Sequence, residues 1–68
     1  GPGGASVVFI APNVILGASS TINTSGSAGS IDGAQGGAGN IYILTRSYTD
    51  NGCTVTQVPN GVKQILLY

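Results

Sequence analysis

The stretch that decides the fold of this chain is Gly37-Ala38-Gly39-Asn40-Ile41-Tyr42-Ile43-Leu44. It resembles Gly3-Gly4-Ala5-Ser6-Val7-Val8-Phe9-Ile10 ahead of it and Gly61-Val62-Lys63-Gln64-Ile65-Leu66-Leu67-Tyr68 behind it. Each copy is a glycine, then three small or polar residues, then four apolar residues. A recurring formula of this kind indicates stacked supersecondary units, each pairing with the next.

Strand-like segments fill most of the chain. The apolar run in each copy is continuous, which is typical of parallel strands buried on both faces. A second, more polar pair of segments alternates β-branched and hydroxyl residues: Ser20-Thr21-Ile22-Asn23-Thr24 and Cys53-Thr54-Val55-Thr56-Gln57. No window has ten residues of helical periodicity, and glycines interrupt every candidate. The sequence therefore predicts an all-β chain with no helix longer than one turn.

The repetition favours a short, parallel β-solenoid-like stack of glycine-punctuated strands. In this arrangement Ile41 and Ile43 lie in one rung, and Ile65 and Leu67 lie in the adjacent parallel rung. The alternative is a small antiparallel β-sandwich, as one part of a homotrimer. The 68 residues make a single domain, 1–68. Because the chain begins at Gly1-Pro2 without methionine, we expect it to be a C-terminal fragment of a longer protein.

Charged residues are scarce, and this excludes several functions. There are two basic and two acidic residues and no histidine. Arg46 and Lys63 do not make a basic patch, so nucleic-acid binding is not expected. With one cysteine, two acids and no histidine, the chain lacks the ligands for zinc or calcium and the groups for paired-carboxylate chemistry, so we expect no enzyme, no metal and no cofactor. No apolar run is long enough for membrane insertion.

A chain of this length buries too little surface to be very stable alone, and small domains usually need a staple. The single Cys53 rules out an intrachain disulfide. The strands also carry few charges that would protect their edges from further pairing. We therefore expect a homo-oligomer.

Three segments carry a resemblance to a known family: Gly36–Leu44, Thr49–Thr56 and Asn60–Tyr68. They resemble the glycine-rich repeats near the C-termini of phage tail-fibre and tail-spike proteins. The resemblance implies a homotrimer in a virion tail or other extracellular structure, and a host surface glycan or protein as partner. The chain departs from the family between Gly26 and Gly39, where it has no long polyglycine tract. A packed polyglycine tip is therefore not expected.

The candidate recognition residues are Tyr48, Arg46 and Asp32. Tyr48 lies beside Arg46 near a turn and is the tyrosine most expected to be exposed, whereas Tyr42 and Tyr68 are expected to pack. Asp32 lies in the glycine-rich insertion, from which it would reach a cation or a sugar. The predicted function is thus structural and receptor-recognising, at the tip of a tail fibre. The alternatives are a self-assembling subunit of an extracellular filament without a specific ligand and, more weakly, ice binding by threonines.

Overall fold

The computed structural model describes residues 1–29 and 33–68. Its strands are β1 (Val7–Leu16), β2 (Thr21–Asn23), β3 (Ile41–Asp50), β4 (Thr54–Thr56) and β5 (Lys63–Leu67). They form a three-stranded sheet in the order β1-β3-β5 and a two-stranded sheet of β2 and β4. Every pair is parallel, and the described residues contain no helix. The all-β class and the parallel pairing are confirmed, and the antiparallel alternative is wrong.

The register of the three-stranded sheet follows the recurring formula. Ile43 lies opposite Phe9 on one side and Ile65 on the other, and Thr45 lies opposite Leu67. The predicted neighbours are therefore in adjacent parallel strands. The second segments also pair in step, with Thr21 opposite Thr54.

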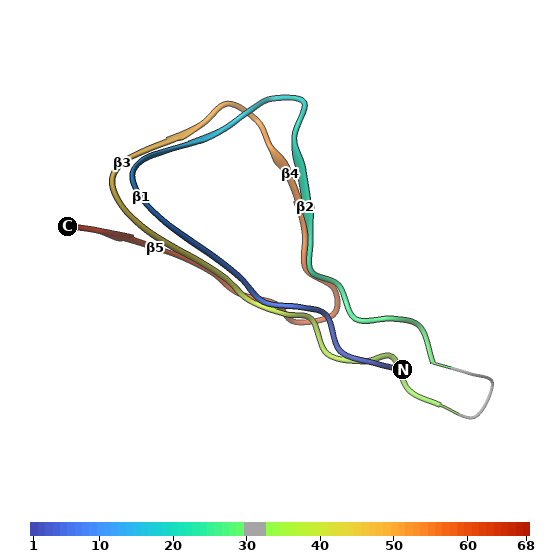
Figure 1. Cartoon of the computed structure of the whole chain (residues 1–68). Helices are drawn as coiled ribbons and strands as arrows, with labels where there is room; N and C mark the ends of the chain where they lie inside the picture. Colours follow the sequence, from blue (N-terminus) through green and yellow to red (C-terminus); the bar gives the residue numbers. More distant parts are fainter. Residues whose placement is uncertain (30–32) are drawn as a thin grey trace.

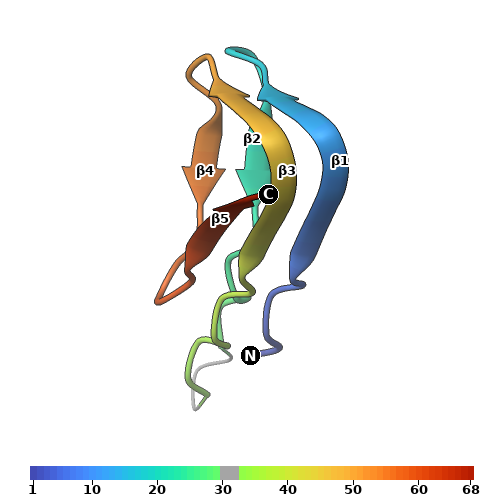
Figure 2. The same ribbon diagram turned by 90° about the vertical axis from the view of Figure 1, so that its left-hand side faces the viewer.

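The chain passes twice along the same three-sided path (Figure 1). The first side, the apolar wall, consists of residues 7–11 and 41–45 with all of β5. The second wall consists of 13–16 and 47–50, and the third of β2 and β4. Figure 2 shows the strands lying side by side, with β1 at one edge of the larger sheet and β5 at the other. Both outer edges lack a neighbouring strand within the part of the chain that the structure describes.

A bend separates the first wall from the second. Before the bend, alternate residues of β1 point inward; at Pro12 and Asn13 two consecutive residues are exposed, and inward positions resume at Val14. The same shift occurs in β3 at Arg46 and Ser47. An extra outward residue of this kind bends a strand and changes the phase of its side chains.

Apolar side chains from the walls fill the interior of the path. Ile41 and Ile43 are 0% and 1% exposed, and Val14 and Leu16 are buried beside them. Further apolar side chains pack against this cluster from neighbouring strands: Val7, Phe9, Ala11, Ile22, Tyr48, Cys53 and Val55. Buried Thr45 satisfies its hydroxyl by donating to the Ser47 carbonyl, 3.0 Å away, next to the bend. The interior is thus a small apolar core in which the Thr45 hydroxyl is paired at the corner, whereas the buried Tyr48 hydroxyl has no hydrogen-bond partner among the described residues.

A glycine projection, formed by residues 1–5, 24–29 and 33–39, extends away from the three walls (Figure 1). Its segments are joined by backbone hydrogen bonds, among them Gly4 N–H to the Gly37 carbonyl (2.9 Å) and Gly39 N–H to the Thr24 carbonyl (2.8 Å). Buried Thr24 also donates its hydroxyl to the Gly39 carbonyl, 2.8 Å away. The segments therefore pack as one body, although the absence of a long polyglycine tract led us to expect no packed tip there.

Glycines three residues apart make this packing possible. A Cβ atom would meet the backbone of a neighbouring segment at each of Gly1, Gly4, Gly26, Gly29, Gly36 and Gly39. None of these glycines has a positive φ, so the close approach of backbones, and not a special conformation, requires glycine there. The same logic places glycine at every third residue where three extended chains meet in collagen.

We expect Gly39→Ala to destabilise the protein by about 2 kcal/mol, because its Cβ would collide with the backbone of Ala5 and overpacking typically costs 1–3 kcal/mol. Gly37→Ala is the matched control: its Cβ would lie 3.9 Å from the Asn60 side-chain oxygen, an ordinary contact. The measurement is urea unfolding followed by circular dichroism. Equal unfolding midpoints for the two variants would show that the projection is not closely packed.

Candidate interaction surface

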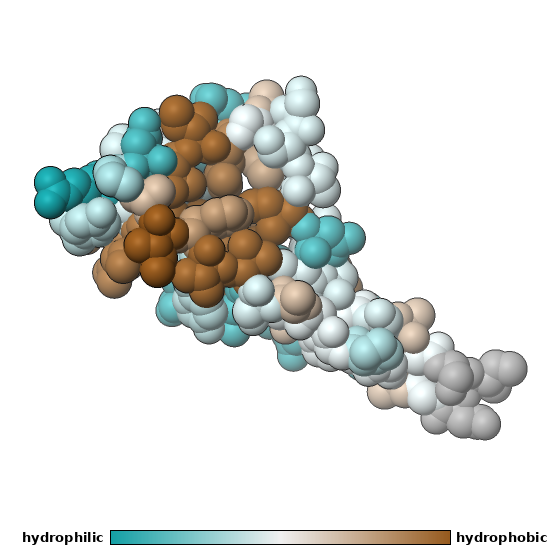
Figure 3. Space-filling model, viewed as in Figure 1, coloured by the Kyte–Doolittle hydropathy of each residue, from teal (hydrophilic) through white to brown (hydrophobic). Residues whose placement is uncertain are grey.

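The outer face of the apolar wall is the most apolar exposed surface among the described residues. Side chains at matching positions of the three strands form a row, with Ile10 beside Leu44 and Leu44 beside Leu66. Ile10 and Leu66 are 70% and 66% exposed, and Val8 and Tyr42 are also exposed. Figure 3, which views the three-sided path end-on, shows apolar residues gathered within and beside the path and a paler, more polar surface over the glycine projection.

The outer faces of the other two walls are mostly polar. Exposed residues there include Asn13, Ser47 and Thr49 on the second wall, and Thr21, Asn23 and Thr54 on the third. The exposed apolar exception is Ile15. One wall of three is thus apolar on both its inner and outer faces. The prediction from its continuous apolar runs that both faces are buried is wrong for the described residues, because the outer face is exposed.

The prediction that Tyr48 is exposed is wrong. Tyr48 lies opposite Val14 in β3, half-buried, and packs against the core. The reason is the bend at Arg46 and Ser47, where two consecutive outward residues shift the alternation and turn position 48 inward. One residue in the sequence indicated this bend. Pro12 occupies the position in β1 that corresponds to Arg46 in β3, between the pairs Ala11–Thr45 and Asn13–Ser47.

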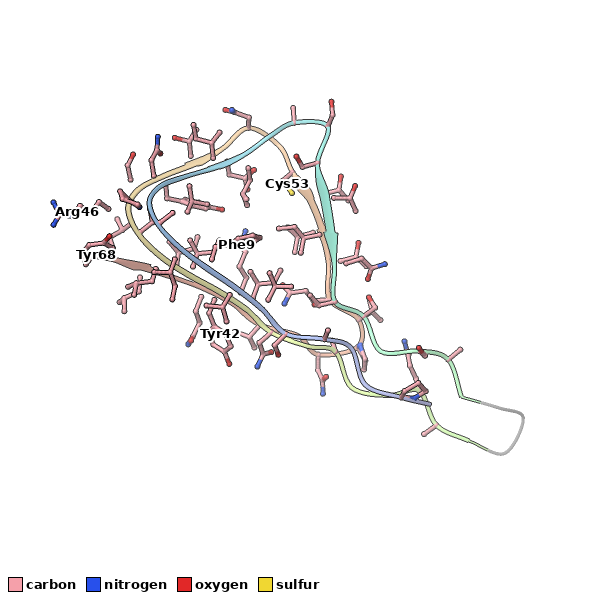
Figure 4. The ribbon with its side chains drawn as sticks, viewed as in Figure 1. Phe9, Tyr42, Arg46, Cys53 and Tyr68 are labelled. Atoms are coloured by element: carbon pink, nitrogen blue, oxygen red, sulfur yellow. The ribbon has the colours of Figure 1, made fainter. Side chains whose placement is uncertain are left out.

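Arg46 is exposed at the bend, and its partner is Tyr68 instead of Tyr48. The guanidinium carbon lies 5.2 Å from the centre of the Tyr68 ring, a cation–π distance (Figure 4). Tyr68 is 57% exposed, so this pair presents an aromatic ring and a positive charge together. Tyr42, also exposed, accepts a hydrogen bond from the Asn40 side-chain amide at 3.1 Å. Asp32 lies outside the described residues.

Asp50 closes the turn between β3 and β4. Its Oδ1 atom accepts hydrogen bonds from the N–H groups of Gly52 (2.9 Å) and Cys53 (3.0 Å), and Gly52 has the positive φ of 105° that this turn needs. These two backbone donors, with a smaller contribution from the Lys63 ammonium 4.0 Å from Oδ2, lower the pKa of Asp50. The Asp50 carboxylate therefore stabilises the turn between β3 and β4.

The described residues contain no pocket and no cluster of three or more potential metal ligands. No helix among them is long and apolar enough to span a membrane. No protein-family model matches the chain, and neither a curated protein nor a solved structure is detectably similar to it. The candidate interaction features that the described residues present are the apolar outer face, the Arg46–Tyr68 pair and the open strand edges.

The lowered pKa of Asp50 predicts a pH dependence of stability. Because the folded state favours the carboxylate, its contribution is present above the unfolded pKa of about 3.9 and is lost as the pH falls through the lower folded pKa. We expect thermal melts to show a smaller loss of Tm between about pH 5 and pH 3 for Asp50→Asn than for the wild type. The amide keeps an acceptor oxygen for the turn. Identical pH profiles would contradict this role for the charge.

Proposed function

We propose that this chain is a non-enzymatic structural module whose two passes are successive turns of a short β-solenoid. It works by assembling with further copies and presenting a surface, in a viral tail fibre or a comparable extracellular structure. The observation that supports this most strongly is the apolar wall with its exposed outer face. A protein that acted alone in water would gain nothing from four large apolar side chains in that position: Val8, Ile10, Tyr42 and Leu66.

The energetics favour association through this face. Full burial of one such side chain contributes about 1.5–3 kcal/mol, and the part that is still exposed here would contribute to association, against the freedom that the partners lose. The face carries no charge that association would have to desolvate. We propose a homo-oligomer in which the apolar walls meet; the trimer is the first choice because the tail-fibre resemblance implies it.

Recognition is assigned to surfaces that this association leaves free. The Arg46–Tyr68 pair, at the bend, combines a planar cation with an exposed ring, and such pairs suit a host surface glycan or protein. The polar second and third walls and the glycine projection also remain exposed. Tyr48, being half-buried against the core, is no longer proposed as a contact residue.

The second candidate function is a self-assembling filament subunit without a specific ligand. The specific observation in its favour is that β1 and β5 are both open edges of a parallel sheet. Open edges with little charge readily accept further strands. The two candidates differ in whether a host ligand binds, and they share the requirement for association.

Leu66→Asp tests the association. We expect the wild type to sediment as an oligomer at micromolar concentration and the variant as a smaller species, because burying an unpaired carboxylate costs several kcal/mol. The measurement is sedimentation velocity, with circular dichroism to check folding. Thr21→Asp, at an exposed site on the polar third wall, is the matched control and should sediment as the wild type does. A wild type that remains a folded monomer would overturn the proposal.

A further inference from the structure

We propose that copies of this chain associate head to tail, with the open edge of β1 in one copy pairing in parallel along the open edge of β5 in another. This inference rests on the proposed function, because it names the surface by which an assembling module would extend. The two open edges match in three respects. They match in which residues direct their backbone N–H and carbonyl groups outward, in how many residues can pair, and in which side chains lie on the same face of the sheet.

The hydrogen-bond phase of each strand is set by the intrachain ladder. Val7 donates its N–H to the carbonyl of Asn40, just before β3, and Ile41 donates its N–H to the carbonyl of Val62, just before β5; both distances are 2.9 Å. Positions 7 and 41 thus direct their backbone groups toward the following strand. Because Lys63 is the register partner of Ile41, the same phase directs residues 63, 65 and 67 of β5 toward its open edge.

The open edge of β1 has the opposite, matching phase. Tyr68 donates its N–H to the Thr45 carbonyl at 3.1 Å, so even-numbered positions of the last segment face back toward the preceding strand. The corresponding positions of β1 are Val8 and Ile10, whose backbone groups face the open edge. The backbone N–H and carbonyl groups that β1 of a second copy presents to β5 are therefore equivalent to those that β5 presents to β3.

The lengths of the two edges also match. After Val8 and Ile10, the next residue whose backbone would face the open edge of β1 is Pro12, and proline has no N–H to donate. Pairing along β1 is thus limited to residues 7–11. β5, at Lys63–Leu67, has the same five residues. The pairing accordingly stays within the apolar wall and does not require a second or third wall beyond β5.

The predicted register between β5 of one copy and β1 of the next buries apolar side chains and leaves no buried charge without a partner. Continuing the pattern of Val7 opposite Ile41 and Ile41 opposite Lys63 places Phe9 opposite Ile65 on the inner face and Ile10 opposite Leu66 on the outer face. β5 is exposed along its whole length, so this pairing covers a strand that the other described residues leave open on one side. Lys63 is the one charged residue in the two segments, and its ammonium already lies 4.0 Å from Asp50.

Pairing of β1 with β1 in another copy would leave β5 uncovered, and so would lateral packing of the apolar walls alone. Head-to-tail pairing covers both edges with one contact. Because the two surfaces differ, the contact is heterologous and repeats in the same direction, which builds a linear array when the rotation between copies does not close a ring.

Cysteine cross-linking tests the register. In a Cys53→Ser background, Val8→Cys and Gln64→Cys would be opposite each other between copies, at the strand spacing of about 4.8 Å, which a disulfide can bridge. Within one chain β3 separates these positions, so they cannot bridge. Both sites are exposed, so the substitutions should preserve the fold, as circular dichroism will check. We expect mild oxidation to produce a ladder of covalent dimers, trimers and longer species.

The matched control pairs Val8→Cys with Leu66→Cys, on the same face but two residues out of register; it should give no ladder. An equally strong ladder from this control, or none from the matched pair, overturns the head-to-tail register. Dimers from Val8→Cys alone would also overturn it, by indicating β1-to-β1 pairing. Sedimentation separates the two proposals: a wild-type oligomer with no matched ladder refutes only the head-to-tail contact, whereas a wild-type monomer refutes both.

Discussion

The structure depends on the parallel, in-register hydrogen bonding of β1, β3 and β5. This ladder brings three copies of one short formula together, so that inward residues of one strand lie beside inward residues of the next. Without it, the chain has no disulfide, no metal ligand set and no helix among the described residues to hold it. The core is correspondingly small, and Ile41 and Ile43 are its best-buried members because they lie in the central strand.

The bend after the first wall decides which side chains are available for contact. Two consecutive outward residues, Pro12 with Asn13 and Arg46 with Ser47, turn both long strands at the same level. The turn moves Tyr48 toward the core and leaves Arg46 outside, beside Tyr68. A shift of one residue in a strand thus exchanges a buried and an exposed position, which is the ordinary consequence of a side-chain period of two.

The glycine projection shows how a segment with almost no side chains can be ordered. Its backbones approach so closely that Gly26 and Gly39 are buried, and hydrogen bonds between segments replace the contacts that side chains would make. The requirement is glycine at every third position and not a continuous glycine tract. This is why residues 26–29 and 33–39 pack closely although their glycine content is modest.

The sequence by itself determined the strand class, the parallel stacking and the opposition of Ile43 to Ile65, because those properties follow from local apolar runs and their repetition. The same runs predict burial on both faces of one wall, but the structure buries only the inner face and leaves Val8 and Ile10 exposed, since no described segment covers the outer one. Only the tertiary structure decided the inward position of Tyr48 and the meeting of Arg46 with Tyr68, since both depend on where a strand bends. The packing of the glycine segments was likewise decided in three dimensions, because it requires backbones from three distant parts of the chain to meet.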